Sequence, residues 1–208
     1  MHPVFLSSLS PFLAWLDIAG VAVFAASGAL AAARAQRTIV TFCFFALVTG
    51  TGGGTIRDLL IDAPVFWMHR TLPVAICLTV AALVWMTPQR WWSSRAIDWF
   101  DAVGLAAYAV YGASKAISAG VPPLPGALMG VVTACFGGIL RDIVAGVPSI
   151  IMRPEIYVTA AALSSGLFVT LSMAGLPSVW PAAIGAVAGF ALRALAISRG
   201  LALPAYRG

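Results

Sequence analysis

The chain has 208 residues, of which 61% are hydrophobic and only 9% are charged, and its mean hydropathy is +0.98. This balance excludes an ordinary soluble globular domain and predicts an integral membrane protein. The net charge is +5, but the basic residues stand in short segments between apolar runs. They therefore indicate membrane topology rather than a phosphate-binding surface, and no nucleic-acid partner is expected.

Seven apolar runs are each long enough to cross about 30 Å of hydrocarbon as a helix, which takes about 20 residues. They lie near residues 12–34, 38–60, 71–88, 99–118, 124–146, 155–174 and 178–197. We therefore predict a single all-α membrane domain over residues 1–208 with seven transmembrane helices. Tryptophans, which anchor helix ends at the membrane surface, stand near the ends of these runs. They are Trp15, Trp67, Trp85, Trp91, Trp92, Trp99 and Trp180.

One short motif, Gly-Gly-x-x-Arg-Asp, occurs at residues 53–58 and again at residues 137–142. The separation of 84 residues, measured from Gly53 to Gly137, is kept without a gap when residues 17–64 are aligned with 101–148. The alignment pairs Asp17 with Asp101, Thr49 with Thr133, Arg57 with Arg141, Asp58 with Asp142 and Pro64 with Pro148. Sustained self-similarity at a fixed spacing indicates an internal repeat.

Each repeat contains three of the predicted crossings, which gives a first repeat over residues 12–91 and a second over 99–175. Because three is an odd number, the second copy enters the bilayer from the opposite face, and the two halves form an inverted pair. Residues 178–208 hold the seventh helix and the tail, which have no repeat partner.

The loops predict the orientation. Seven arginines fall on the side that carries the C-terminus, namely Arg34, Arg37, Arg90, Arg95, Arg153, Arg199 and Arg207, whereas the other side offers Arg70 and Lys115. Positive charge accumulates on the cytoplasmic side of membrane proteins. We expect a multi-pass protein of the cell's inner (plasma) membrane with its N-terminus outside and its C-terminus in the cytoplasm.

Glycines interrupt the second and fifth predicted helices. They are Gly50, Gly52, Gly53, Gly54, Gly137 and Gly138. Each costs a helix about 1 kcal/mol relative to alanine, so we predict that both helices are bent or broken there. A break would free the carbonyls around Thr49 or Thr133 to face a cation, or the following amides to face an anion. The alternative is that the glycines only permit close helix packing.

Arg57 lies four residues beyond Gly53, about 6 Å along a helix axis, and so remains within the hydrocarbon zone. A charge at such depth costs about 2.5–3.5 kcal/mol, so it should face a cavity or pair with an opposite charge. Adjacent residues on a helix diverge, which makes Arg57 and Asp58 poor partners for each other. The expected partners are Asp17, Asp101 or a crosswise arrangement of Arg57 with Asp142 and Arg141 with Asp58. The alternative role is to fasten helices together.

Further polar side chains are candidates for the same pathway, namely Ser27, Thr49, Thr51, Thr55, Tyr108, Tyr111, Ser114, Lys115 and Thr133. The hydroxyls of Thr49 and Thr133 either coordinate a partly dehydrated ion or bond their own helix backbone. Lys115, near the outer end of the fourth helix, either joins the pathway or extends to the membrane surface.

Motifs of metal sites and enzymes are missing from the sequence. Cys43, Cys77 and Cys135 stand inside predicted helices without paired spacing, which favours small buried hydrophobic side chains over disulfides or zinc ligands. The sequence contains neither a His-Glu-x-x-His helix nor a Gly-x-Ser-x-Gly elbow. We expect no enzymatic activity, no metal site and no cofactor, with membrane lipids around the protein.

Seven helices in an inverted three-plus-three repeat, with Gly-Gly-x-x-Arg-Asp in helices 2 and 5, resemble the prokaryotic branch of the trimeric intracellular cation (TRIC) channels. The resemblance implies a homotrimer with one pore in each protomer, lined by helices 1, 2, 4 and 5. It also implies passive conduction of monovalent cations, with K⁺ or Na⁺ transported and potassium preferred, and kinks at Gly52, Gly53, Gly54, Gly137 and Gly138. The second copy departs from the first at Phe136, which stands where the first has Gly52.

A secondary transporter for a small solute is the alternative function. Related bacterial proteins with this repeat have been labelled glycine transporters, and inverted repeats serve alternating access equally well.

Overall fold

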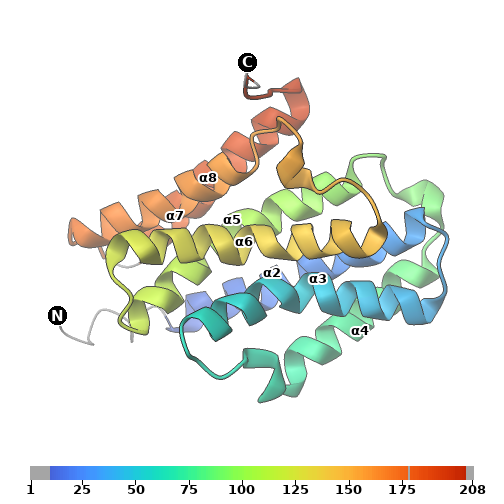
Figure 1. The fold of residues 1–208 in the computed structure, drawn as a ribbon, viewed down its shortest axis with the longest axis horizontal. Coiled ribbons are helices and arrows are strands. Elements are labelled where there is room, and N and C mark those ends of the chain that lie inside the picture. The colour runs from blue at the N-terminus through green and yellow to red at the C-terminus, as the bar shows by residue number, and fades with distance from the viewer. Residues whose placement is uncertain (1–9, 178, 205–208) are drawn as a thin grey trace.

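The computed structural model describes residues 10–177 and 179–204, and within them the chain forms one bundle of α-helices (Figure 1). The α-helices are α2 (Ser10–Arg34), α3 (Ile39–Leu60), α4 (Thr71–Met86), α5 (Ala96–Ser118), α6 (Pro123–Ala145), α7 (Val158–Met173) and α8 (Val179–Arg199). The 3-10 helices are η1 (Phe66–Met68), η2 (Gln89–Trp91) and η3 (Ile150–Met152). Every predicted crossing coincides with one α-helix to within three residues, so the seven-helix prediction is confirmed. Arg207 lies outside the described residues.

The seven helices differ in how well they match the thickness of a membrane. Four are long and apolar enough to span one, and they are α2 from Trp15, α3, α6 and α8. The third helix of each repeat, α4 or α7, has only 16 residues, or about 24 Å of helix. Helix α5 is long but carries Asp98, Asp101 and Lys115. Length and charge are thus unevenly shared, and the charged helix needs partners inside the protein.

The loops after α3 and α6 repeat one another. Asp62 follows α3 with a φ of 53°, and Gly146, at the matching position after α6, has a φ of 69°. Asparagine-like and glycine residues tolerate this left-handed conformation best, and it turns the chain sharply out of the helix. A 3-10 helix then follows in each repeat, η1 or η3. The internal repeat therefore extends from the helices into their connecting loops.

Helices α3 and α6 lie side by side and run in opposite directions (Figure 1). A Cβ added to Gly53 would overlap the carbonyl oxygen of Thr133, and one added to Gly137 would lie 2.7 Å from the carbonyl oxygen of Thr49. The two contacts are equivalent, because Gly53 matches Gly137 and Thr49 matches Thr133 in the repeat. The helices therefore cross about a pseudo-two-fold axis, as an inverted repeat requires.

Helices α2 and α5 also pack through a pair of equivalent contacts, each between a glycine of one helix and an aromatic ring of the other. Gly20 lies under the ring of Tyr108, and a Cβ added to Gly104 would lie 2.8 Å from the ring of Phe24. The two rings are themselves in contact, with centroids 5.4 Å apart. Since Gly20 matches Gly104 and Phe24 matches Tyr108 in the repeat, α2, α3, α5 and α6 form one pseudo-symmetric core.

The glycines do not break their helices. Helix α3 runs without interruption through Gly50, Gly52, Gly53 and Gly54, and α6 runs without interruption through Gly137. The expectation of a broken helix was wrong. The glycines serve close approach, and at Gly53 and Gly137 the carbonyls of the matching threonines pack against them. A kink short of a break stays a prediction.

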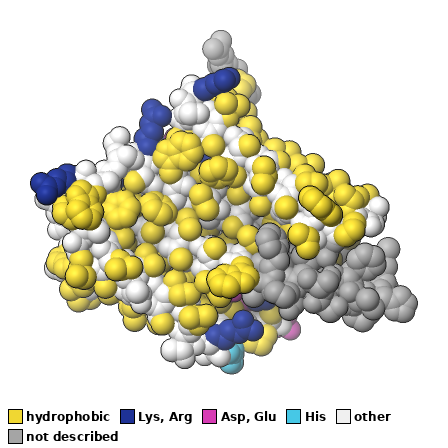
Figure 2. Space-filling model, turned by 180° about the vertical axis from the view of Figure 1, so that it is seen from behind, with side chains coloured by type: hydrophobic (Ala, Val, Ile, Leu, Met, Phe, Trp, Pro, Cys, Tyr) yellow, Lys and Arg dark blue, Asp and Glu magenta, His cyan; other side chains and the backbone are white. Residues whose placement is uncertain are grey.

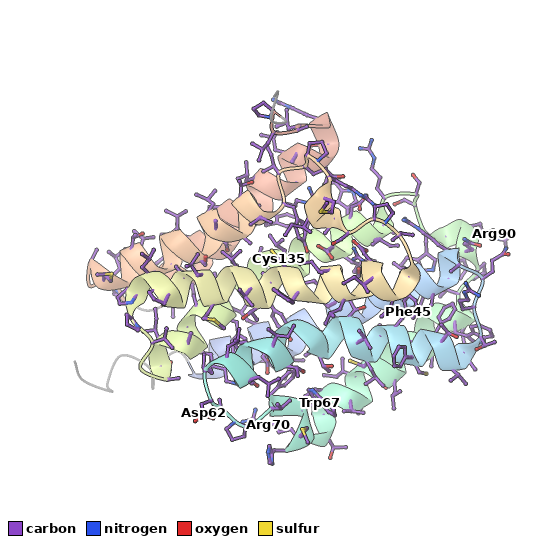
Figure 3. The ribbon with its side chains drawn as sticks, in the orientation of Figure 1. Phe45, Asp62, Trp67, Arg70, Arg90 and Cys135 are labelled. Atoms are coloured by element: carbon purple, nitrogen blue, oxygen red, sulfur yellow. The ribbon has the colours of Figure 1, made fainter. Side chains whose placement is uncertain are left out.

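The surface agrees with a lipid environment at the sides of the bundle. Figure 2 shows a face dominated by hydrophobic side chains, with most of its basic side chains gathered toward one end. Arg90 lies at the end of the bundle away from Asp62 and Arg70 (Figure 3). The five described tryptophans at helix ends that are exposed are Trp15, Trp85, Trp91, Trp99 and Trp180. This distribution matches the predicted loops, while the direction of insertion stays a prediction.

We predict that Gly53→Ala lowers the stability of the protein by about 1–3 kcal/mol, because the added methyl group overlaps the Thr133 carbonyl and forces the helices apart. Gly166→Ala is the matched control. Gly166 stands inside α7 with nothing within 4 Å of an added Cβ, so helix propensity alone should keep stability unchanged or raise it. Thermal unfolding of the detergent-solubilised protein measures both. Equal melting temperatures for the two variants would contradict the close crossing.

Candidate functional site

Both Arg-Asp motifs are buried. Arg57 and Asp58 at the end of α3 are 0% exposed, and Arg141 and Asp142 at the end of α6 are each 4% exposed. Hydrocarbon and a packed protein interior are equally poor solvents for an isolated charge, so each group must be compensated by neighbours. The arrangement of those neighbours defines two clusters, one for each repeat.

Within each motif the arginine pairs with the aspartate beside it. Arg57 Nε donates to Asp58 Oδ1 at 2.8 Å, and Arg141 Nε donates to Asp142 Oδ1 at 2.9 Å. The expectation that adjacent residues would be poor partners was wrong, because the long arginine side chain folds back along its own helix. The crosswise pairs are also absent among the described residues, where each motif is closed on itself.

The second carboxylate oxygen of each aspartate ties the helix to the loop that follows it. Asp58 Oδ2 accepts a hydrogen bond from the backbone amide of Phe66 at 3.0 Å, and Asp142 Oδ2 accepts one from that of Ile150 at 2.7 Å. Those amides begin η1 and η3. Each aspartate therefore joins an arginine on the helix to a 3-10 turn in the loop, at matching positions of the repeat.

Each guanidinium nitrogen of Arg141 has a partner, and we call this set the second cluster: Arg141, Asp142, Asp101 and Ser27. Arg141 Nη1 donates to Asp101 Oδ1 at 2.7 Å and to Ser27 Oγ at 2.5 Å. Asp101 comes from α5 and Ser27 from α2, so three helices meet at one guanidinium. The prediction of Asp101 as a counter-charge for the motif is confirmed.

Around Arg57 the compensation is different, and we call this set the first cluster: Arg57, Asp58, Lys115 and Tyr111. Lys115 Nζ on α5 donates to Asp58 Oδ1 at 2.8 Å. The Arg57 guanidinium lies over the ring of Tyr111, 5.0 Å from its centroid, and its Nη1 has no hydrogen-bond partner among the described residues. Lys115 therefore belongs to the site through its bond to the buried Asp58, although its side chain is still 26% exposed.

Asp17 does not take the role of its repeat partner. Asp101 pairs with Arg141, but among the described residues the carboxylate of Asp17 accepts a single long contact, of 3.4 Å from the Tyr108 hydroxyl. Its expected pairing with Arg57 is wrong for this conformation. A buried polar atom without a partner costs about 1–3 kcal/mol. Among the described residues both clusters carry such atoms, Arg57 Nη1 in the first and Asp101 Oδ2 in the second.

The candidate threonines are buried at the helix crossing. Thr133 Oγ1 donates to the carbonyl of Met129 at 2.6 Å, which is the bond to its own helix that was the alternative to ion coordination. Thr49 Oγ1 has no hydrogen-bond partner among the described residues. Thr49 therefore keeps its hydroxyl hydrogen for a further group, whereas Thr133 keeps only its oxygen lone pairs.

Three residues beside the second cluster were not predicted from the sequence, namely Tyr157, Glu155 and Arg193. A Cβ added to Gly138 would lie 2.8 Å from the Tyr157 hydroxyl and 3.0 Å from Asp101 Oδ1. Arg193 of α8 lies over the Tyr157 ring at 5.2 Å and pairs with Glu155 at 2.8 Å. Arg193 could have been predicted, because an arginine inside a predicted transmembrane helix indicates a functional or paired charge. Tyr157 could not, because the matching residue of the first repeat is Pro73.

These features define a class of protein: a multi-pass membrane protein built as an inverted repeat, with a cluster of compensated charges in each half. A family model described as "Glycine transporter" matches residues 14–89 and 98–173, which are the two repeats. The inner membrane protein YadS of Escherichia coli, a UPF0126 protein, is 36% identical over 92% of this chain and 95% of its own length.

Solved structures give the particular family. The TRIC trimeric intracellular cation channel orthologue from Rhodobacter sphaeroides is 41% identical, with a TM-score of 0.85 over 91% of this chain and 99% of that chain. A prokaryotic TRIC channel crystallised in 0.5 M KCl is 26% identical, with a TM-score of 0.86 over 92% and 98% of the two chains. The chain belongs to the prokaryotic TRIC family, whose members are cation channels and not enzymes.

We predict that Gly138→Ala destabilises the protein and that Tyr157→Phe relieves part of the cost. The added methyl group would collide with the Tyr157 hydroxyl, and phenylalanine removes that hydroxyl while keeping the ring over Arg193. A double-mutant cycle on thermal unfolding should give a favourable coupling of about 0.5–3 kcal/mol. Gly54→Ala is the control, since its methyl group would meet Phe66 instead. Additive effects of Gly138→Ala and Tyr157→Phe would contradict the contact between these two positions.

Proposed function

We propose that this protein is a passive channel for monovalent cations that prefers potassium, with one pore in each protomer of a homotrimer. The proposal places it in the cell's inner membrane with the C-terminus in the cytoplasm. The observation that carries it is the match to the Rhodobacter sphaeroides channel, which extends over 99% of that chain at 41% identity. The inner-membrane name of the Escherichia coli relative and the arginine bias of the loops support the location.

The proposed path follows the pseudo-two-fold core of α2, α3, α5 and α6. It would pass the first cluster in one half of the membrane and the second cluster in the other. Intramembrane charges that face a bundle interior commonly mark ion pathways, which supports this assignment. The second cluster holds two carboxylates, of Asp101 and Asp142, against one guanidinium, so its charge favours cations.

Conduction requires a rearrangement of the present conformation. Arg57 and Asp58 are fully buried, and Thr133 is as well, so water does not reach them here. An ion that crosses a bilayer needs water or polar groups along its whole path. The first cluster is the one that reaches the surface, because the Lys115 side chain is 26% exposed, so we expect the rearrangement to begin there.

A transporter of a small solute such as glycine is the second candidate. The description of the matching family model favours it, since that model covers both repeats. Inverted repeats also suit a carrier that opens alternately to each side of the membrane. The two candidates differ in rate and in whether transport saturates.

Recordings from the purified protein in planar bilayers distinguish the two candidates. We predict discrete unitary currents whose reversal potential follows the potassium gradient and shifts when sodium replaces potassium on one side. Uptake of labelled glycine into vesicles that hold the same protein should stay at the level of empty vesicles. Saturable glycine uptake without unitary currents would reject the channel and establish the carrier.

A further inference from the structure

A cavity of about 320 Å³ opens where the ends of α2, α3 and α4 meet their connecting segments. Its polar lining comes from Gln36, Arg37, Thr87 and Gln89, and its aromatic walls are Trp85 and Trp92. None of these residues belongs to either charged cluster. The lining residue Gln89 precedes Arg90, which Figure 3 shows at the end of the bundle away from Asp62 and Arg70.

A second, smaller cavity adjoins the first. It has a volume of about 110 Å³, shares Gln89 and Trp92 with its neighbour and adds Arg34, Ser93 and Ser94 to the lining. The two cavities are therefore neighbours that share walls, and each has an arginine in its lining. We call the pair the α2–α4 site.

The walls of the α2–α4 site are held in place by specific contacts. Trp92 Nε1 donates to Thr87 Oγ1 at 2.8 Å, and the Trp85 ring meets the Phe42 ring edge-on with centroids 5.0 Å apart. Arg34 Nη2 donates to the carbonyl oxygen of Ser94. A preformed cavity binds a ligand without the cost of ordering its walls.

The charge of the site is positive. Arg34 and Arg37 are exposed, so their guanidinium groups stay available to a ligand. Among the residues that the structure describes, neither cavity has an acidic side chain in its lining. Arginine forms paired hydrogen bonds with phosphate oxygens, and glutamine, threonine and serine supply further donors. The lining therefore suits a phosphate group.

The surroundings of the site are those of the membrane surface. Val40 at the start of α3 is 74% exposed and Met86 at the end of α4 is 79% exposed, so apolar side chains flank the opening. Tryptophan side chains concentrate at the level of lipid headgroups. A ligand here would place its polar part among the arginines and its apolar part along the outer surface of the helices.

We propose that the α2–α4 site binds the headgroup of an acidic phospholipid such as phosphatidylglycerol. The phosphate pairs with Arg37 and Arg34, the glycerol of the headgroup meets Gln36 and Gln89, and the acyl chains descend past Val40 and Met86. The aromatic walls pack against the glycerol backbone of the lipid. This site is independent of what the protein conducts.

Native mass spectrometry of the full-length, detergent-solubilised protein tests the proposal. Titration with phosphatidylglycerol or phosphatidylcholine should show one acidic lipid per protomer that binds at lower concentration than the zwitterionic lipid. The double variant Arg34→Gln, Arg37→Gln should lose this preference. Each arginine near acidic lipid contributes a factor of about five to affinity, so the combined loss should be about 25-fold.

Arg199→Gln is the matched control, since it removes one exposed arginine from the end of α8 outside the site, and it should keep the preference. Trp85→Ala tests the aromatic wall without a change of charge and should weaken binding of the acidic lipid. Circular dichroism and gel filtration establish that each variant is folded. Equal lipid preference in the wild type and the double variant would overturn the proposal.

Inorganic phosphate separates a lipid site from a site for a soluble anion. We expect millimolar inorganic phosphate to leave the bound phosphatidylglycerol in place, because it lacks acyl chains to bury against the helices. Displacement of the lipid by phosphate at the lipid's own concentration would overturn the lipid assignment. A wild-type protein without any preference between the two lipids would do the same.

Discussion

The close crossing of α3 and α6 is the contact on which the rest of the structure depends. A threonine carbonyl of the opposite helix packs against Gly53 and another against Gly137, and neither position has room for a side chain. In a membrane, where lipid tails are as apolar as a protein interior, helices associate through such close packing rather than through the hydrophobic effect. The crossing fixes the pseudo-two-fold axis and sends the two motifs toward opposite ends of the bundle.

The buried charges follow from this geometry. Each arginine stands one turn beyond its glycine and therefore has to be compensated inside the protein. In each half, the aspartate next to the arginine accepts hydrogen bonds from that arginine and from a loop amide. The charge of each arginine is therefore compensated within its own repeat. The halves then diverge through α5, which supplies Asp101 to one cluster and Lys115 to the other. The pseudo-symmetric scaffold thus holds two clusters of different charge.

Much of this architecture was predictable from the sequence. The spans follow from hydropathy, and the inverted repeat follows from an odd number of crossings between rare matched residues such as Asp17 and Asp101. The pairing of Arg57 with Asp58 was not predictable, because neighbouring side chains leave a helix in different directions and only the length of arginine lets its guanidinium bend back to the aspartate. The bond from Asp58 to Phe66 depends on a loop conformation that no periodicity encodes. The glycines are ambiguous in sequence, since close packing and a broken helix require the same residue.

The central claim is that cations pass the first cluster, and the unitary potassium conductance of Lys115→Gln tests it most directly. Lys115 is partly exposed and adds a positive charge beside Asp58, so its removal should raise potassium conductance at low salt. The increase should shrink at high salt, where charges are screened. Arg70→Gln, which removes an exposed charge from the neighbouring loop, is the control and should change conductance less. A conductance of Lys115→Gln equal to that of the wild type at every salt concentration would contradict the account.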